Sequence, residues 1–256
     1  MTLLPLPAFT DNYIWMLHNG HDALVVDPGD AQPVLDALQR NSLTLHCILV
    51  THHHADHTGG VNVLREATGA RVYGPAHEKI PEPVQRMSDG DQVSALGMDF
   101  TVMDVPGHTS GHIAFFANPR GEPPLLFCGD TLFSAGCGRL FEGTPEQMLE
   151  SLGRLSDLPP ETRVCCTHEY TLSNLRFARV VEPDNKATAE YQTHCQQLRN
   201  AGQPTLPSTI AREQLINPFL RTHLDSVMHE VIRHDAQRVS AEGVFATLRQ
   251  WKNNFQ

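Results

Sequence analysis

The segment Val50-Thr-His-His-His-Ala-Asp-His-Thr-Gly-Gly60 places four strong metal ligands within six residues, directly after a short apolar run. The run Cys47–Val50 predicts a buried strand, and Gly59-Gly60 lets the backbone approach closely before a helix begins. In proteins with alternating strands and helices, reactive groups lie at this position, outside the carboxyl end of a strand. A histidine-rich polar loop without a ligand is the alternative, and the density of ligands makes it the weaker interpretation.

The ligand types within this segment divide between two points in space. His52 and His54 are separated by one residue and point the same way in an extended chain, so they can bind one metal. Asp56 and His57 follow after a turn and face a second metal. His53 alternates away from its neighbours, which predicts a packing or hydrogen-bonding role. The segment therefore serves two metals and supplies only part of the ligands of each.

Three later apolar runs also end in His or Asp, in Val105-Pro-Gly-His108, Leu126-Phe-Cys-Gly-Asp130 and Val164-Cys-Cys-Thr-His168. Each run alone is weak evidence, because a single His or Asp after a strand is more often an ordinary polar residue. Together they complete two sets of three ligands that leave each metal an open position, as in catalytic sites. The expected ligands are His52, His54 and His108 for one metal, Asp56, His57 and His168 for the other, and Asp130 as a bridge.

The rest of the chain divides into two parts of different texture. Up to about Tyr170, apolar strand-like runs alternate with helix-like segments and with turn signals such as Asp27-Pro-Gly. After that point the apolar residues recur at helical spacing, and no strand is expected. The sequence predicts a mixed α/β catalytic domain over residues 1–168 and a helical substrate-binding domain over residues 169–256.

Individual elements follow from the same patterns. Apolar runs predict strands at Asn12–Leu17, Ala23–Val26, Cys47–Val50, Arg71–Tyr73, Phe100–Val105, His112–Ala117, Leu125–Cys128 and Arg163–Cys166. Helical spacing predicts helices at Ala31–Arg40, Gly59–Thr68, Thr144–Leu155, Leu172–Val180, Lys186–Asn200, Thr209–Leu215, Leu224–Asp235 and Ala241–Trp251. Thr144 as N-cap, Pro145 at the first helical position and Gln147 three residues after the cap predict a capping box.

Composition argues against two classes of function. The chain has 256 residues with 19 basic and 29 acidic side chains, and a net charge of −10 disfavours nucleic-acid binding, which needs a basic surface. No run approaches the ~20 apolar residues of a membrane span, and the N-terminus shows no signal-peptide pattern. The six cysteines form no C-x-x-C pair and are typical of reduced thiols. The expectation is a cytoplasmic monomer with a small-molecule substrate and with no nucleic-acid or membrane partner.

The ordered motifs T-H-x-H-x-D-H, P-G-H, G-D and a final H resemble those of the metallo-β-lactamase superfamily. Within it, the chain is similar to glyoxalase II, the hydroxyacylglutathione hydrolases, over essentially its whole length. The segments that carry this closer resemblance include Ala135-Gly-Cys-Gly-Arg139-Leu-Phe141-Glu-Gly-Thr, Thr167-His-Glu-Tyr170-Thr, Asn217-Pro-Phe and Arg249-Gln-Trp-Lys252. The resemblance implies a four-layer αββα sandwich with the metals at one edge of two facing sheets and a C-terminal helical domain.

The resemblance also implies an activity. It is the hydrolysis of an S-(2-hydroxyacyl)glutathione thioester, usually S-D-lactoylglutathione, to glutathione and a 2-hydroxy acid, the second step of methylglyoxal detoxification. A hydroxide that bridges the two metals is the expected nucleophile, with Asp56 orienting it and Asp130 completing the catalytic set. Zinc is the expected metal, with iron and manganese as alternatives, because mixed nitrogen and oxygen ligands suit all three. Asp27 and Thr51 are expected to hold ligands by hydrogen bonds.

Substrate binding is assigned by the same resemblance to Arg139, Phe141, Tyr170, Arg249 and Lys252. Phe141 stands where the family often has Tyr, so it supplies no phenolic hydrogen bond, and Arg139 keeps the charge of the Lys that is common at its position. From helical spacing alone, Arg249 and Lys252 belong to a solvated face of the last helix.

Three other functions compete with this one. A lactonase or β-lactamase on the same scaffold is the nearest, although the helical tail disfavours it. An iron-dependent persulfide dioxygenase also acts on glutathione-derived substrates, but it needs one redox metal with open positions for oxygen. A non-catalytic metal-binding or nucleic-acid module lacks the basic surface that it requires.

Overall fold

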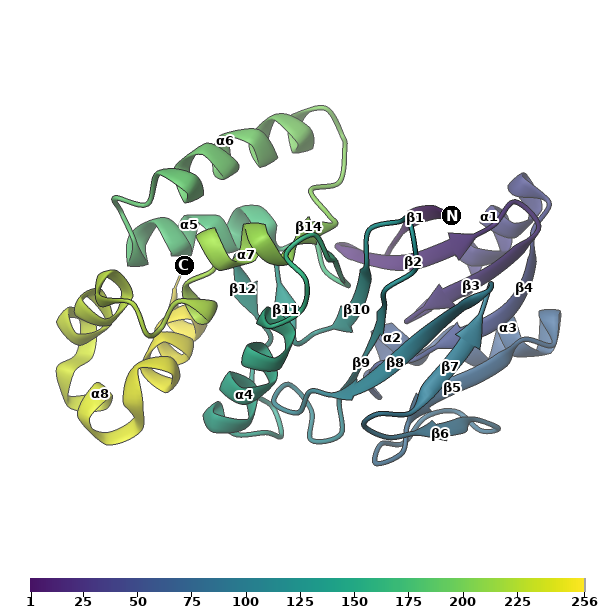
Figure 1. Cartoon of the computed structure of the whole chain (residues 1–256), viewed down its shortest axis with the longest axis horizontal. Coiled ribbons are helices and arrows are strands. Elements are labelled where there is room, and N and C mark those ends of the chain that lie inside the picture. The colour runs from purple at the N-terminus through teal and green to yellow at the C-terminus, as the bar shows by residue number, and fades with distance from the viewer. Residues whose placement is uncertain (256) are drawn as a thin grey trace.

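The computed structural model describes residues 1–255, and most of its strands form two six-stranded sheets that face each other (Figure 1). The first sheet has the order β1-β2-β3-β4-β5-β6. Its strands are β1 (Thr2–Ala8), β2 (Asn12–His18), β3 (Asp22–Val26), β4 (Thr44–Leu49), β5 (Arg71–Pro75) and β6 (Gln85–Met87). Strands β3 to β6 run parallel, so their carboxyl ends lie at one edge.

The second sheet has the order β14-β13-β10-β9-β8-β7, and β11 and β12 form a separate hairpin. Its strands are β7 (Gln92–Ala95), β8 (Met98–Asp104), β9 (Ile113–Ala117), β10 (Leu125–Gly129), β13 (Arg163–Cys166) and β14 (Ser208–Thr209), with the hairpin at Leu132–Phe133 (β11) and Gly136–Cys137 (β12). Strands β10 and β13 are parallel neighbours, so Asp130 and His168 follow strands that end at the same edge.

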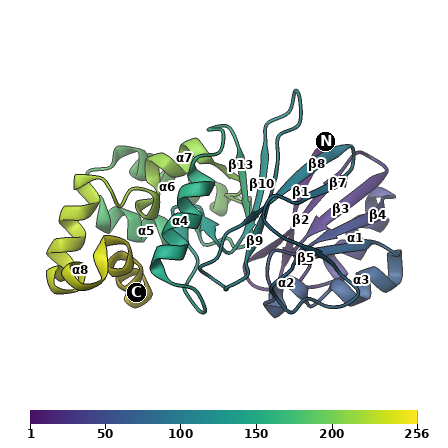
Figure 2. The same cartoon turned by 60° about the horizontal axis from the view of Figure 1, so that its bottom comes forward.

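Helices cover the outer faces of both sheets (Figure 2). They are α1 (Gln32–Asn41), α2 (Ala55–Thr58), α3 (Val61–Thr68), α4 (Pro145–Ser156), α5 (Thr171–Val181), α6 (Lys186–Asn200), α7 (Ile210–Ile216), a 3₁₀ turn (Pro218–Leu220) and α8 (Asp225–Asn254). In both views α1 and α3 lie on the outside of the first sheet, and the later helices lie beyond the second. The four-layer αββα arrangement with a C-terminal helical region is confirmed.

The core follows from side-chain alternation in the strands. Along β2, Trp15 and Leu17 point into the apolar layer between the sheets, while Ile14 and Met16 point into the layer beneath α1 and α3. All four are at most 1 % exposed. A strand that is buried on both faces therefore reads as a continuous apolar run, because successive side chains alternate between two cores.

Several expectations about the elements were wrong. The strands β1, β6 and β7 were not predicted. Pro5 and Pro7 lie within β1, and β1 is at the edge of its sheet, where a missing amide donor is tolerated. The region after Tyr170 does contain a strand, since β14 pairs with β13 through Val164 and Ser208.

One helix boundary also differs from the expectation. The helix predicted at Gly59–Thr68 begins at Val61, and a separate short helix, α2, carries Asp56 and His57. The two last predicted helices both lie within α8, and the expected break between them is present, because the backbone leaves the helical conformation at Asp235 and again at Gly243. The capping box of α4 is confirmed, with reciprocal bonds between Thr144 and Gln147. All six cysteines are free and buried. No helix within residues 1–255 combines the length and the apolar character that a membrane crossing requires.

Candidate metal centre

The seven residues expected to bind metal all follow the carboxyl ends of strands at one edge of the two sheets. They come after four strands: His52, His54, Asp56 and His57 after β4, His108 after β8, Asp130 after β10 and His168 after β13. Segments that are far apart in the sequence therefore meet because their strands end at a common edge.

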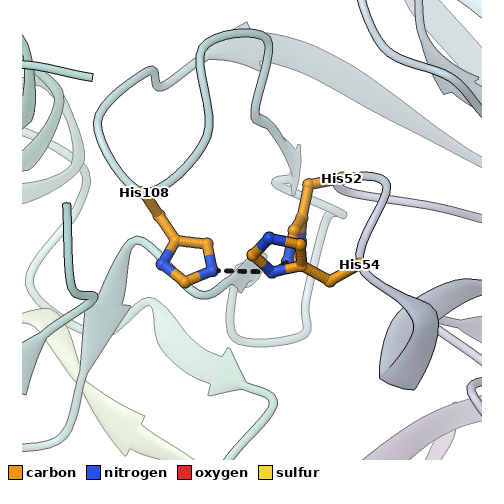
Figure 3. Close-up of side chains that lie close together, drawn as sticks. All are labelled: His52, His54 and His108. Atoms are coloured by element: carbon orange, nitrogen blue, oxygen red, sulfur yellow. Dashed lines mark hydrogen bonds between the residues drawn. The ribbon is translucent and has the colours of Figure 1, made fainter. Parts of the chain in front are cut away.

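The first set of ligands consists of His52, His54 and His108, which face one another across two loops (Figure 3). His52 Nε2 lies 3.0 Å from His54 Nδ1, and His54 Nδ1 lies 3.1 Å from His108 Nε2. Burial lowers the pKa values of all three imidazoles. Three neutral rings thus direct nitrogen lone pairs to one point, and this geometry suits a cation.

The second set consists of Asp56, His57 and His168, whose ligand atoms also lie within 4.8 Å of one another. Asp56 Oδ2 is 3.5 Å from His57 Nε2 and 3.5 Å from His168 Nε2. Two nitrogens and one carboxylate oxygen therefore surround the second point.

Asp130 lies between the two sets. Its Oδ2 is 3.4 Å from His108 Nε2 and 3.3 Å from His168 Nε2, and its Oδ1 is 3.6 Å from His57 Nε2. Burial would raise the pKa of Asp130, yet the imidazoles of His57 and His168 hold it well below its usual range. Asp130 is thus an ionised carboxylate with one oxygen close to both sets, as a bridging ligand requires.

Two atoms in the centre test whether a metal fits. Nε2 of His57 and Oδ1 of Asp130 are buried and have no hydrogen-bond partner among residues 1–255. Burial would lower the pKa of His57, but the carboxylates of Asp130 and Asp27 outweigh it and raise that pKa well above the usual value. A positive charge is favoured here, and a buried polar atom without a partner is costly. Divalent metals, whose ligands are nitrogen and oxygen atoms of this kind, satisfy both conditions.

Hydrogen bonds fix which nitrogen of His52 and of His108 is free to bind the first metal. Thr51 donates its hydroxyl proton to Asp27 Oδ2 (2.8 Å), and His52 Nδ1 lies 3.1 Å from the same hydroxyl oxygen. His108 Nδ1 donates to the carbonyl oxygen of Arg139 (2.9 Å). In both rings Nδ1 therefore carries the proton and Nε2 is left free to bind a metal. Thr51 and Asp27 have the supporting geometry that the sequence predicts.

Two carboxylates lie beside the outer nitrogens of the second set, one in an ion-pair contact and one in a hydrogen bond. His57 Nδ1 lies 3.1 Å from Asp27 Oδ2, and His168 Nδ1 lies 2.7 Å from Asp11 Oδ1. Asn12 Nδ2 donates to Asp56 Oδ2 over 3.0 Å. Asp11 and Asn12 were not predicted as supporting residues, because no motif marks them. Asp11 lies in the turn before β2 and Asn12 is the first residue of that buried strand, and this place in the chain is their local signal.

We expect replacement of Asp11 by Ala to lower the affinity of the second set for its metal by about 10- to 100-fold, the usual effect of losing a partner that orients a ligand. The second set is affected because Asp11 contacts His168 alone among the candidate ligands. Titration of metal-free protein against a competing chelator measures both dissociation constants. Asp99→Ala on the exposed side of β8 is the control. Unchanged constants in the Asp11 variant would contradict this role.

A cavity of about 670 Å³ opens over the metal centre. Ligands from both sets line it together with all five residues expected to bind substrate: Arg139, Phe141, Tyr170, Arg249 and Lys252. Phe141 is 63 % exposed, and its ring lies edge-on to His108 with the centroids 5.2 Å apart. Tyr170 stacks on His168 at 4.7 Å. Both rings therefore lie beside the metal ligands at the cavity wall.

The solvated helix face that spacing favoured for Arg249 and Lys252 was wrong. Arg249 is only 5 % exposed and donates to the carbonyl oxygen of Cys137 over 2.8 Å. Burial and the nearby guanidinium groups of Arg249, Arg176 and Arg139 lower the pKa of Lys252 to about 8. Arg139, Arg249 and Lys252 line the cavity and form a cation wall, which is suited to an anion.

Helix α7 fixes the hairpin that leads to Arg139. Glu213 accepts a hydrogen bond from the backbone amide of Ala135 (2.7 Å), and Asn217 Nδ2 donates to the carbonyl oxygen of Gly136 (2.9 Å). Glu213 in α7 and Asn217, which caps the carboxyl end of α7, are both fully buried. The helical region therefore shapes the cavity wall as well as lining it.

Comparisons with known proteins agree with this geometry. A model of the metallo-beta-lactamase superfamily matches residues 8–168, and a model of the hydroxyacylglutathione hydrolase C-terminus matches residues 169–255. Proteins named hydroxyacylglutathione hydrolase are similar over nearly full length. Those of Albidiferax ferrireducens and Nitrosomonas europaea are 62 % and 47 % identical, covering 100 % of this chain and 100 % and 97 % of their own. That of Pseudomonas fluorescens is 56 % identical over 98 % of both chains.

Solved structures share the fold. ETHE1 from Myxococcus xanthus is 26 % identical with a TM-score of 0.65, over 98 % of this chain and 97 % of its own. The BLEG-1 B3 metallo-beta-lactamase is 23 % identical with a TM-score of 0.63, over 86 % of this chain and 99 % of its own. TTHA1623, solved in a di-iron-bound form, is 33 % identical with a TM-score of 0.56, over 64 % and 91 %. Full-length identity and both family models lead to one assignment: the chain belongs to the hydroxyacylglutathione hydrolase family of the metallo-beta-lactamase superfamily.

Proposed function

We propose that this chain hydrolyses S-D-lactoylglutathione, and S-(2-hydroxyacyl)glutathione thioesters in general, to glutathione and a 2-hydroxy acid. One observation carries the proposal: ligands of a candidate two-metal centre and a group of cations line the same cavity. The first supports attack on a thioester carbonyl, and the second supports binding of the anionic glutathione portion. The names of the full-length relatives point to the same substrate class.

The proposed cofactors are two divalent cations, with zinc as the metal and iron or manganese as alternatives. His52, His54 and His108 would hold one ion, Asp56, His57 and His168 the other, and Asp130 both. When bound, such a pair supplies hydroxide at neutral pH and polarises the carbonyl group under attack. The mixed nitrogen and oxygen donors suit zinc and are also compatible with iron or manganese.

Asp56 is proposed to orient the attacking water. Its carboxylate lines the cavity, and the hydrogen bond from Asn12 fixes Oδ2 beside His57 and His168. Burial would raise the pKa of Asp56, but His57 and the Asn12 hydrogen bond lower it. The carboxylate is therefore ionised and can accept a hydrogen bond from the attacking water. The leaving thiolate needs no dedicated acid, because a thiol pKa lies near 8.5.

The cation wall is proposed to bind the carboxylates of glutathione. Arg139, Arg249 and Lys252 lie on this wall, and guanidinium and ammonium groups form strong charge-assisted hydrogen bonds with carboxylates. Phe141 and Tyr170 would contact the apolar part of the substrate near the metal ligands. Phe141 does so without a hydroxyl, so its contribution is packing alone.

The proposed division of labour follows the chain. Residues 1–168 form the catalytic domain and residues 169–256 the substrate-binding domain, because the ligand set ends at His168 while Arg249 and Lys252 come from α8. The proposed oligomeric state is a monomer. The free, buried cysteines support a cytoplasmic location, where thiols stay reduced.

The decisive experiment is turnover of S-D-lactoylglutathione by the purified protein, with metal analysis of the same sample. We expect efficient hydrolysis, about two metal ions per chain, and loss of turnover after chelation that added metal restores. A simple lactone and a β-lactam serve as comparison substrates. Faster turnover of either, or oxygen uptake with glutathione persulfide by an enzyme with one iron per chain, would overturn the proposal in favour of a rival activity.

A further inference from the structure

A buried carboxylate outside the ligand set joins the two loops that supply the first metal position. Glu78 lies between β5 and β6, and its side chain is only 2 % exposed. It has no motif in the sequence and binds none of the seven ligands directly. Its neighbours are His53 on one side and Thr109 on the other.

Both oxygens of Glu78 accept hydrogen bonds from these loops. Oε2 accepts from the backbone amide of His53 (2.6 Å) and lies 3.0 Å from His53 Nδ1. Oε1 accepts from the hydroxyl of Thr109 and from the backbone amide of Gly111 (3.1 Å). His53 lies between the ligands His52 and His54, and Thr109 follows the ligand His108. One carboxylate therefore connects both segments that supply this position's nitrogen ligands.

The surroundings of Glu78 accommodate this link specifically. A side chain at Gly111 would bring a Cβ within 2.7 Å of Glu78 Cγ, so only glycine leaves the carboxylate its place. Arg86 donates to the backbone carbonyl of Glu78 (2.5 Å) and so fixes the loop that carries it. Four donors around two oxygens stabilise a buried carboxylate, whose burial without partners is costly. An amide in its place has one oxygen, so it can serve only one of the two loops.

The supports of the second metal position do not include Glu78. Asn12, Asp27 and Asp11 lie beside Asp56, His57 and His168, and Asp27 alone of these three also reaches the first position, through Thr51 and His52. We propose that Glu78 is a positioning residue that sets the affinity of the His52–His54–His108 position for its metal without setting that of the other. This inference rests on the proposed two-metal centre. Loss of a partner behind the ligands typically weakens metal binding by about 10- to 100-fold.

The test compares Glu78→Gln with Glu142→Gln. Glu142 is the matched control, because it lies 3.4 Å from Nε2 of the same His53 but on the exposed side, and it holds only Ser110 of the second loop. Metal-free protein is titrated with Zn²⁺ against a chelator of known affinity, giving two dissociation constants. For Glu78→Gln we expect one constant to rise about 10- to 100-fold and the other to stay within about threefold. Glu142→Gln should match the wild type in both.

Double variants identify which position is affected. In a His108→Ala background the first position is already weakened, and Glu78→Gln should leave the dissociation constant of the second position unchanged. In a His168→Ala background the second position is weakened instead, and Glu78→Gln should raise the dissociation constant of the first position by the same factor as in the wild type. If Glu78→Gln does not fold, Thr109→Val removes one of the four hydrogen bonds to Glu78 and should raise the dissociation constant of the first position by a smaller factor.

The outcomes separate the inference from the function beneath it. Wild-type protein that binds fewer than two ions would overturn the two-metal centre and the inference with it. Wild-type protein that binds two ions, with a Glu78→Gln variant that binds both as tightly, would overturn the inference alone. An equal loss at both positions would assign Glu78 a general structural role and would also overturn it. Melting temperatures of the metal-free variants, expected to match within a few degrees, confirm that the fold is intact.

Discussion

Asp130→Ala is expected to lower kcat/KM for S-D-lactoylglutathione by at least about 1000-fold. Asp130 is close to both ligand sets, with Oδ2 at 3.4 Å from His108 Nε2 and 3.3 Å from His168 Nε2. A metal contributes several kcal/mol of charge stabilisation in the transition state, and each 1.36 kcal/mol is a factor of ten in rate. Removal of the bridge also takes away one of the two carboxylates beside the buried His57 and leaves only Asp27. Steady-state kinetics and metal content per chain measure both consequences.

The control for this variant is Asp184→Ala, which removes a carboxylate from an exposed position of the helical region. It should keep wild-type kinetics and metal content. The Asp130 variant should also lose bound metal, because one shared ligand is gone from both positions. Wild-type turnover by Asp130→Ala would rule out the two-metal mechanism.

Replacement of Arg249 and Lys252 together by Ala is expected to raise KM by about 100-fold or more and to change kcat far less. A hydrogen bond to a charged group contributes about 1.5–3 kcal/mol, which is a factor of about 10 to 100 in affinity. The two cations lie on the cavity wall away from the ligand sets, so their loss weakens binding of substrate and transition state alike. Steady-state kinetics with S-D-lactoylglutathione measure the split. A large loss of kcat at unchanged KM would contradict a binding role.

Single variants of Lys252 separate charge from structure, because Arg249 also donates to the Cys137 carbonyl. Lys252→Ala should raise KM and Lys252→Arg should restore it, while Lys186→Ala on the exposed start of α6 serves as the control.

The pKa of Lys252 is about 8, lowered by burial and by the guanidinium groups around it. The charged form binds the anion, so KM should be lowest below pH 8 and rise as the pH passes it. Lys252→Arg should abolish that rise, since Arg keeps its proton.

The candidate metal ligands were predictable because each of them follows a strand closely. An apolar run that ends in His or Asp is a local signal, and β4 in one sheet and the parallel pair β10 and β13 in the other bring such ends to one edge. The supporting residues gave no such signal. Asp11 reaches His168 across 157 positions and Glu78 reaches His53 across 25. Contacts of this kind depend on loop conformations that neither spacing nor propensity specifies.

The cation wall shows the same limit more sharply. Helical periodicity predicts that Arg249 and Lys252 lie on a polar face of the last helix, and such faces are usually exposed to solvent. Here the face meets the hairpin β11–β12, with Arg249 bound to Cys137 across 112 positions. A pattern within one helix indicates which residues share a side, and the rest of the fold decides what that side meets. Likewise, Pro5 and Pro7 lie within β1, and sequence alone does not tell an edge strand, which tolerates them, from a central one.

The short strand β14 has a consequence for the catalytic part of the molecule. It pairs Ser208 and Thr209 with Val164 and Arg163 of β13, at the end of the second sheet. A protein that ended after residue 168 would leave the amides and carbonyls along that side of β13 without partners. Exposed strand edges recruit strands from other chains and promote aggregation. The helical region therefore also protects the solubility of the part that holds the metals, a task unrelated to the substrate.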